Sequence, residues 1–300
     1  MISFVYKHVF QQYRDKISPP QTTRRRFSKF SHLLQAIVRH CVVALALGLA
    51  QMTEVGAEPQ EKNHNPRTAD QSHIELTFGA AYTNQPLSGG ARTRSRATPL
   101  IDAELRVGRF FASTTRGIGY NVVNRDTLTV GIAAGYLWGR KESDDTRYRG
   151  LENIAGSPAV IASIIWSPIG EAILLYAAIT QTIGHEQGRF AMIGTILGFP
   201  IAGSLSGFID LSGTWSDKQY ARRFYGVGPT ESARSGYPVY QPTSGWSGTS
   251  GIFGVSYELT PTWSIGAGLG ATRLEGTAAQ SPIFNKSTLP YASLFATYAN

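Results

Sequence analysis

The feature of this chain that most restricts its fold is a period of two in the placement of apolar residues, which begins near His73. In 127–138 one face is apolar and the other is small or polar; the apolar face holds Leu128, Val130, Ile132, Ala134, Tyr136 and Trp138. The same alternation recurs in 205–215, 253–259 and 263–272. Successive side chains of a β-strand point to opposite faces, so this pattern predicts strands rather than helices.

Strand length and aromatic placement favour a membrane barrel over a soluble β-sandwich, which also has one apolar face per sheet. The strands run to about ten residues or more, the length that crosses a bilayer at a tilt. Aromatic residues lie at strand ends, as in interfacial girdles: Tyr136, Trp138, Trp215 and Trp263. Charged residues make up only 16%, and no segment reaches the ~20 apolar residues of a spanning helix. We expect an all-β fold, a closed antiparallel transmembrane β-barrel.

The alternation and the intervening turn residues predict twelve strands. Their expected ranges are 73–83, 97–106, 109–115, 117–122, 127–140, 157–168, 170–183, 188–200, 203–216, 246–259, 262–275 and 288–299. Without the short pair in 109–122, ten strands remain and the order of connections is unchanged. The long connections at 84–96, 141–156, 217–245 and 276–287 then share one end, which outer-membrane barrels turn to the outside, while short periplasmic turns form the other.

The first 57 residues have the organisation of an export signal. They contain eight Lys and Arg against two acidic residues, so the net charge of +8 resides mostly there, and the basic balance gives no support for nucleic-acid binding. An apolar run from Cys41 to Ala50 precedes the small residues at 55–57, which predicts cleavage before Glu58. A twin-arginine export motif at 23–29 is the less favoured alternative. Residues 58–72 are expected to form a flexible periplasmic segment, and 73–300 the barrel.

The loop at 140–152 is the most densely charged segment of the chain. Its carboxylates (Glu142, Asp144 and Asp145) could hold a divalent cation, and Arg147 with Arg149 could engage lipopolysaccharide phosphates. The carboxylates do not follow the spacing of a calcium loop. We therefore favour a solvated loop with internal ion pairs, and predict no metal site.

The loop at 217–245 combines arginine with aromatic residues. The binding candidates are Arg222, Arg223, Tyr225, Arg234 and Tyr237. Rigid aromatic area beside directed guanidinium donors is typical of recognition surfaces. The same residues could equally fold the loop over the barrel mouth as a lid, and both interpretations stay open.

The enzyme alternative is an outer-membrane hydrolase. Beyond residue 57 the chain has only His64, His73 and His185, and it lacks a Gly-x-Ser-x-Gly motif. No arrangement of nucleophile and base is visible, so we predict neither catalysis nor a cofactor. The expected lumen charges are Asp210 and Glu258.

Several segments resemble the MipA/OmpV family of outer-membrane proteins, in order and spacing across most of the chain after the leader. They are Arg109-Phe110-Phe111 with Arg116-Gly117-Ile118-Gly119-Tyr120-Asn121, Gly139–Asp145 with Arg149-Gly150-Leu151, Phe224-Tyr225-Gly226-Val227 with Ser232–Tyr240, and Trp263-Ser264-Ile265-Gly266 with Ser281-Pro282-Ile283. The resemblance implies an outer-membrane barrel. For some members it implies a scaffold that joins a murein hydrolase to a murein synthase, and for others an adhesin.

These observations lead us to expect a non-enzymatic scaffold or binding protein of the cell envelope. The alternative is a narrow pore for small solutes, and a hydrolase is the minor alternative. The expected partners are outer-membrane lipid and lipopolysaccharide, with a periplasmic murein hydrolase or synthase on the strength of the resemblance.

Overall fold

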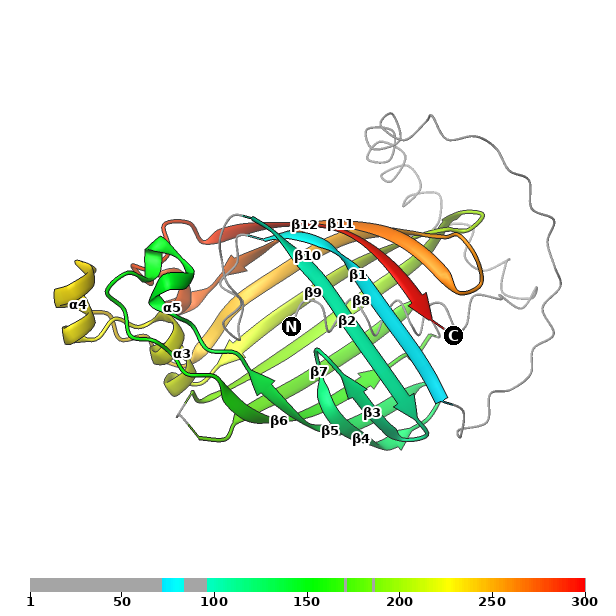
Figure 1. Cartoon of the computed structure of the whole chain (residues 1–300), viewed down its shortest axis with the longest axis horizontal. Coiled ribbons are helices and arrows are strands. Elements are labelled where there is room, and N and C mark those ends of the chain that lie inside the picture. Colours follow the sequence, from blue (N-terminus) through cyan, green and yellow to red (C-terminus); the bar gives the residue numbers. More distant parts are fainter. Residues whose placement is uncertain (1–71, 84–95, 170–171, 185–186, 300) are drawn as a thin grey trace. The chain divides into compact units, whose positions relative to one another are not determined.

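The computed structural model describes residues 72–83, 96–169, 172–184 and 187–299. Twelve antiparallel strands form a closed barrel in which each strand pairs with its neighbours in sequence (Figure 1). The strands are β1 Ser72–Thr83, β2 Arg96–Val107, β3 Phe110–Ser113, β4 Gly117–Asn124, β5 Leu128–Leu137, β6 Ser157–Trp166, β7 Ile173–Thr182, β8 Arg189–Ala202, β9 Leu205–Ser216, β10 Gly245–Glu258, β11 Trp263–Leu274 and β12 Thr288–Ala299.

The first and last strands close the barrel. β1 pairs with β12 from Glu75↔Ala299 to Thr83↔Tyr291. This ladder removes the two sheet edges, which in a lipid environment would expose unpaired backbone groups. The prediction of twelve strands is confirmed, and the ten-strand alternative is wrong. The expected export signal and residues 58–71 of the expected flexible segment lie outside the described residues, and Ser72 belongs to β1.

The two faces of the wall follow the alternation in the sequence. On β9, Leu211 is 49% exposed on the outside, whereas Asp210 is buried on the inside. On β5, Ile132 is exposed while Thr129 and Ala133 are buried. The lipid-facing and lumen-facing residues therefore separate as the period of two predicts.

Aromatic side chains mark both rims of the outer surface. Tyr136, Trp138 and Trp246 are exposed toward the ends of strands at one rim, and Trp166, Tyr257 and Trp263 are exposed at the other. Such residues occupy the headgroup level of a bilayer, because their rings are apolar with one polar atom. The two rims thus bound a lipid-facing band.

The β3–β4 hairpin is shorter than the rest of the wall. β3 has four residues and β4 has eight, and only Glu104–Val107 of β2 pair with β3. β4 begins directly after the hairpin turn with Gly117, which has a φ of +82°; a Cβ there would lie 2.0 Å from the carbonyl oxygen of Ala134. Only glycine fits this close approach.

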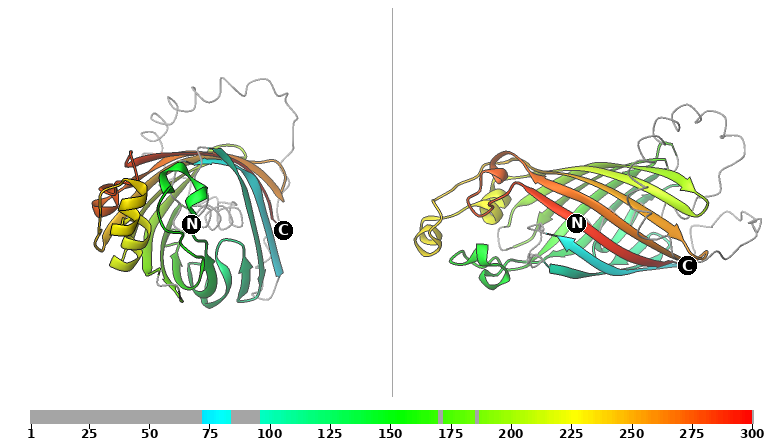
Figure 2. Two further views of the ribbon diagram at one scale, coloured as in Figure 1. Left: turned by 60° about the vertical axis from the view of Figure 1, so that its left-hand side comes forward. Right: turned by 90° about the horizontal axis from the view of Figure 1, so that it is seen from above.

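The long connections of the described residues share one end, as predicted; the connection expected at 84–96 lies outside the described residues except for Arg96. The turns 108–109, 125–127, 203–204 and 259–262 are short. At the other end, 138–156 carries two 3-10 helices (η2 Glu142–Asp144 and η3 Thr146–Tyr148), 217–244 carries α3 Lys218–Tyr225 and α4 Pro229–Ser235, and 275–287 carries α5 Gly276–Ala279. Figure 2 shows the three α-helices at this same end. None of the helices in the described part of the chain is long and apolar enough to cross a membrane.

The face assignment can be tested by a pair of adjacent substitutions. We expect Leu211→Arg to lower the free energy of unfolding by roughly 2–4 kcal/mol, because it places a charge in the lipid-facing band. Ser212→Arg, its neighbour on the inward face, is the matched control and should cost much less. The measurement is folding into vesicles, followed by the heat-dependent shift on gels. Equal losses for both variants would contradict the assignment.

Candidate functional site

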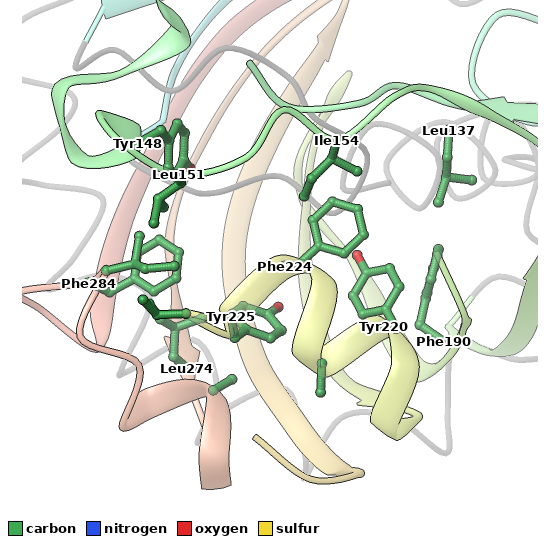
Figure 3. Packing of buried hydrophobic residues seen from close by; sticks show 14 of the residues in the cluster. Leu137, Tyr148, Leu151, Ile154, Phe190, Tyr220, Phe224, Tyr225, Leu274 and Phe284 are labelled. Atoms are coloured by element: carbon green, nitrogen blue, oxygen red, sulfur yellow. The ribbon is translucent and has the colours of Figure 1, made fainter. Parts of the chain in front are cut away.

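The loops at the helical end of the barrel share a hydrophobic core of their own, here called the loop core (Figure 3). Its members come from the three loops and from the adjoining strand ends: Leu137, Tyr148, Leu151, Ile154, Ala159, Phe190, Tyr220, Ala221, Phe224, Tyr225, Val227, Leu274, Ala278, Ile283, Phe284 and Leu289. Burial of this much apolar side chain is the dominant favourable term in ordering a segment. These loops therefore form a folded layer.

The helix α3 supplies the centre of the loop core. Asp217 caps its N-terminus, since one carboxylate oxygen accepts a hydrogen bond of 2.7 Å from the backbone N–H of Tyr220. Tyr220, Ala221, Phe224 and Tyr225 lie on its buried side. The Tyr220 ring stacks on Phe224 with centroids 4.4 Å apart and also contacts Phe190 of β8. The helix is thereby fixed to the barrel wall.

Polar contacts join the other two loops to α3. The Arg140 guanidinium donates to the carbonyl oxygen of Phe224 at 3.2 Å and lies over the Tyr148 ring. From 275–287, the Ser281 hydroxyl donates to the carbonyl oxygen of Tyr225 at 2.7 Å. Burial lowers the pKa of Arg140 and raises that of Tyr225 to about 12. Tyr225 is therefore uncharged at neutral pH.

A close backbone approach joins 138–156 to α4. Gly150 has a φ of +83°, and a Cβ there would lie 2.6 Å from the backbone nitrogen of Ser235. Nearby, the backbone N–H of Glu152 donates to Glu231 at 2.8 Å. The loop 138–156 is thus tied to both helices of 217–244.

The structure separates the binding candidates of 217–245. Arg222 and Arg234 are exposed, and Arg222 donates to Gln241. Arg223 is half-buried and pairs with Glu152 at 3.6 Å. Tyr225 is buried in the loop core, and Tyr237 packs against it. The aromatic members therefore stabilise the layer, while Arg222 and Arg234 remain accessible.

The charged loop is organised by internal contacts. Asp145 accepts two hydrogen bonds of 3.0 Å from the Arg147 guanidinium. Glu142 accepts from the backbone of Gly150, and Asp144 accepts from the backbone of Lys141. Arg149 is exposed. Glu142, Asp144 and Asp145 thus each have a partner within the loop. The described residues contain no group of three His, Cys, Asp or Glu that could hold a metal ion.

A buried cluster of charged residues lies inside the barrel. This cluster was not predicted from the sequence. Glu104 of β2 accepts hydrogen bonds from Arg116 at the tip of the β3–β4 hairpin and from Arg106 at 3.0 Å. Asp102 accepts from Thr114 and Thr115. The signal was present in the alternation of 102, 104 and 106, all charged and all on the inward face. The lumen therefore carries more charged residues than the predicted Asp210 and Glu258.

The closed ladder, the apolar outer band and the folded loop layer define a β-barrel of the outer-membrane type. The family model described as MltA-interacting protein MipA matches residues 76–300, and the chain belongs to this family. This confirms the resemblance found in the sequence.

Individual relatives are more distant. The MltA-interacting proteins of Escherichia coli (strain K12) and Shigella flexneri are each 33% identical to this chain over 84 residues, which is 28% of this chain and 34% of each relative. The alignment thus spans about a third of these relatives. Among solved structures, the NanC porin covers 74% of this chain and 98% of its own, with 10% identity and a TM-score of 0.38. An outer membrane channel from Pseudomonas putida F1 covers 81% of this chain and 100% of its own, with 9% identity and a TM-score of 0.39.

Removal of one aromatic ring should loosen the loop layer without unfolding the barrel. We expect Phe224→Ala to destabilise the layer by about 3–5 kcal/mol, since it leaves a cavity among buried neighbours. Arg222→Ala, on the exposed side of the same helix, is the control and should have little effect. Limited proteolysis of the folded barrel reports the difference. Loops equally resistant in both variants would contradict the role of the loop core.

The Asp145–Arg147 pair makes the order of 138–156 dependent on pH. Burial alone would raise the pKa of Asp145, but the hydrogen bonds from Arg147 lower it overall, below its ordinary value of 3.8. A depressed pKa stabilises the loop above 3.8, and this contribution is lost as the pH falls through the lower value of the folded state.

We therefore expect Asp145→Asn to speed hydrogen exchange in 140–152 at neutral pH. The difference from the wild type should shrink once the pH falls below the folded-state pKa of Asp145. The comparison is made between the two proteins at the same pH, so that intrinsic exchange rates cancel. A difference that persists unchanged at acid pH would show that the pair is not its source.

Proposed function

We propose that this protein is exported by cleavage of its 1–57 leader, inserts in the outer membrane and acts there as a non-enzymatic scaffold. Its partner in this proposal is a murein hydrolase of the MltA class. Two observations support it: the lipid-facing band bounded by aromatic rims, and membership of a family named for an interaction with MltA.

The observation that carries the non-enzymatic part is the use of the loop residues. Aromatic side chains of the three loops are buried together in the loop core, and Arg140 and Ser281 join the loops by hydrogen bonds to α3. A catalytic site would need a nucleophile and a base held within hydrogen-bond distance. Among the described residues the only histidine is His73, on β1. His64 and His185 lie outside them.

The partner surface in this proposal is the end with short turns, together with 58–71. Long loops of outer-membrane barrels face outward, so the short turns face the periplasm. Exposed residues on this rim include Arg125 and Asp126 in the β4–β5 turn, and Ile169 and Leu259 in two others. A stable interface needs about 800 Å² from each partner. The short turns alone provide little of this area, which is why the N-terminal segment is included.

The test uses the purified full-length mature chain in lipid nanodiscs and the purified MltA-class hydrolase of the same organism. We expect saturable binding that is weakened about tenfold or more by Arg125→Glu with Asp126→Lys on the short-turn rim, about 1.4 kcal/mol. Arg234→Glu on α4 at the opposite end is the control and should leave binding unchanged. Absence of binding would refute the scaffold, and loss only with Arg234→Glu would move the partner surface to the outer loops.

A narrow pore is the second candidate, favoured by the inward charges Asp102, Glu104, Arg116 and Asp210. A barrel of this strand number has internal room between that of filled eight-stranded barrels and open porins. A steady single-channel current that changes with Glu104→Gln would support the pore. Electrical silence of the folded barrel would remove it.

A further inference from the structure

A cavity of about 960 Å³ opens between the loops 138–156 and 275–287. It is lined by Lys141, Glu142, Ser143, Asp145, Thr146, Arg147, Arg149, Asn153, Asn285, Lys286 and Leu289. This volume is at the upper end of the range of small-molecule sites. Neither the scaffold nor the pore makes use of it.

The cavity has an excess of positive charge. Four basic and two acidic side chains line it, a net charge of +2. Asp145 is neutralised by Arg147 through paired hydrogen bonds, and Glu142 accepts from the backbone of Gly150. The remaining cations, Lys141, Arg149 and Lys286, are exposed and have no ion pair within the described ranges. Arg147, a candidate phosphate ligand from the sequence, is thus paired with Asp145. Lys141 and Lys286 are available as phosphate ligands instead.

The walls of the cavity are held in position by contacts already formed. The Asp145–Arg147 pair fixes η3, and the Arg147 guanidinium lies 5.9 Å from the ring centroid of Phe284, a member of the loop core in the facing loop. Asn153 accepts a hydrogen bond of 2.7 Å from the backbone N–H of Glu142 through its carbonyl oxygen. This bond leaves the amide NH₂ group of Asn153 available as a donor. The site is therefore preorganised and has neutral donors beside its cations.

We propose that this cavity binds a phosphate monoester carried on a sugar. A phosphate monoester bears a charge of about −1.5 to −2 at neutral pH, which matches the excess charge of the lining better than a single carboxylate does. Lysine and arginine are the usual partners of phosphate oxygens. The amides of Asn153 and Asn285 and the hydroxyl of Ser143 suit sugar hydroxyls.

The position of the cavity relates it to the membrane surface. Trp138, 68% exposed on the outer wall, precedes Lys141 by three residues and marks the headgroup level. The same chemistry occurs in the phosphorylated sugars of lipopolysaccharide headgroups and in free sugar phosphates. The experiment has one arm for each source.

The protein is the full-length mature chain, in zwitterionic detergent for calorimetry with glucose 6-phosphate and in nanodiscs for binding of lipopolysaccharide. Glucose and enzymatically dephosphorylated lipopolysaccharide are the comparisons without phosphate monoesters. The cavity variant is Lys141→Gln, Arg149→Gln and Lys286→Gln. The matched control removes three exposed charges elsewhere: Lys218→Gln on α3, Arg109→Gln in the β2–β3 turn and Arg273→Gln on β11. Heat-dependent gel migration verifies that each variant is folded.

We expect the cavity variant to bind the phosphorylated probe at least tenfold more weakly than both the wild type and the control. If the cavity variant loses binding of glucose 6-phosphate, the ligand is a soluble sugar phosphate. If it loses binding of lipopolysaccharide alone, the ligand is a lipid-borne one. The proposal is overturned if the wild type binds neither probe, if phosphate makes no difference, or if the cavity variant binds as well as the control. Binding of the murein hydrolase by the cavity variant is measured separately, so failure of the scaffold is distinguishable from failure of this site.

Discussion

The hydrocarbon interior of a membrane offers no water to backbone N–H and C=O groups, and the architecture of this protein follows from that constraint. The pairing of β1 with β12 satisfies it by joining the two edges of the sheet. Once the sheet is closed, each strand has one face toward lipid and one toward the interior. The period of two in the sequence results from these two environments, since a charge at an outward position in the lipid-facing band destabilises the barrel.

The loop end of the molecule is free of this constraint, because water can hydrogen-bond to its backbone groups. Its segments gain order by burying Tyr220, Phe224 and Tyr225 against residues from two other loops and from strand ends. The cationic cavity depends on this core, since one of its walls carries Arg147 against Phe284. A recognition site on loops needs such support, because loops without a core are mobile.

The strands could be predicted from the sequence because their signal is local. Alternation within 127–138 or 205–215 reveals both the strand and its two faces, and the lengths of the connections reveal which end each loop joins. The α3 helix was also readable: Asp217 is an N-cap residue, and apolar residues at 220, 221, 224 and 225 have helical spacing. The expectation for 217–245 was a loop without a helix, with recognition and a lid as open alternatives.

The cavity and the interior ionic cluster could not be derived in the same way. Lys141 and Lys286 meet across one cavity although 145 positions separate them, and no local pattern connects them. Glu104 and Arg116 are closer in sequence, but their contact depends on where the short hairpin ends. Sites of this kind arise from long-range packing, which a single sequence does not display.

The short β3–β4 hairpin has a mechanical consequence. Arg96–Ile101 of β2 pair in the ladder with β1 alone, and Gly135–Leu137 of β5 pair with β6 alone, so the sheet between β2 and β5 is continuous only toward the short-turn rim. Elsewhere the wall resists shear through ladders that run most of its height. Here the ion pairs of Arg116 and Glu104 brace the hairpin tip from inside. The wall therefore has a compliant sector on its loop side, and the barrel is stiffer on the side of β8–β11 than on the side of β2–β5.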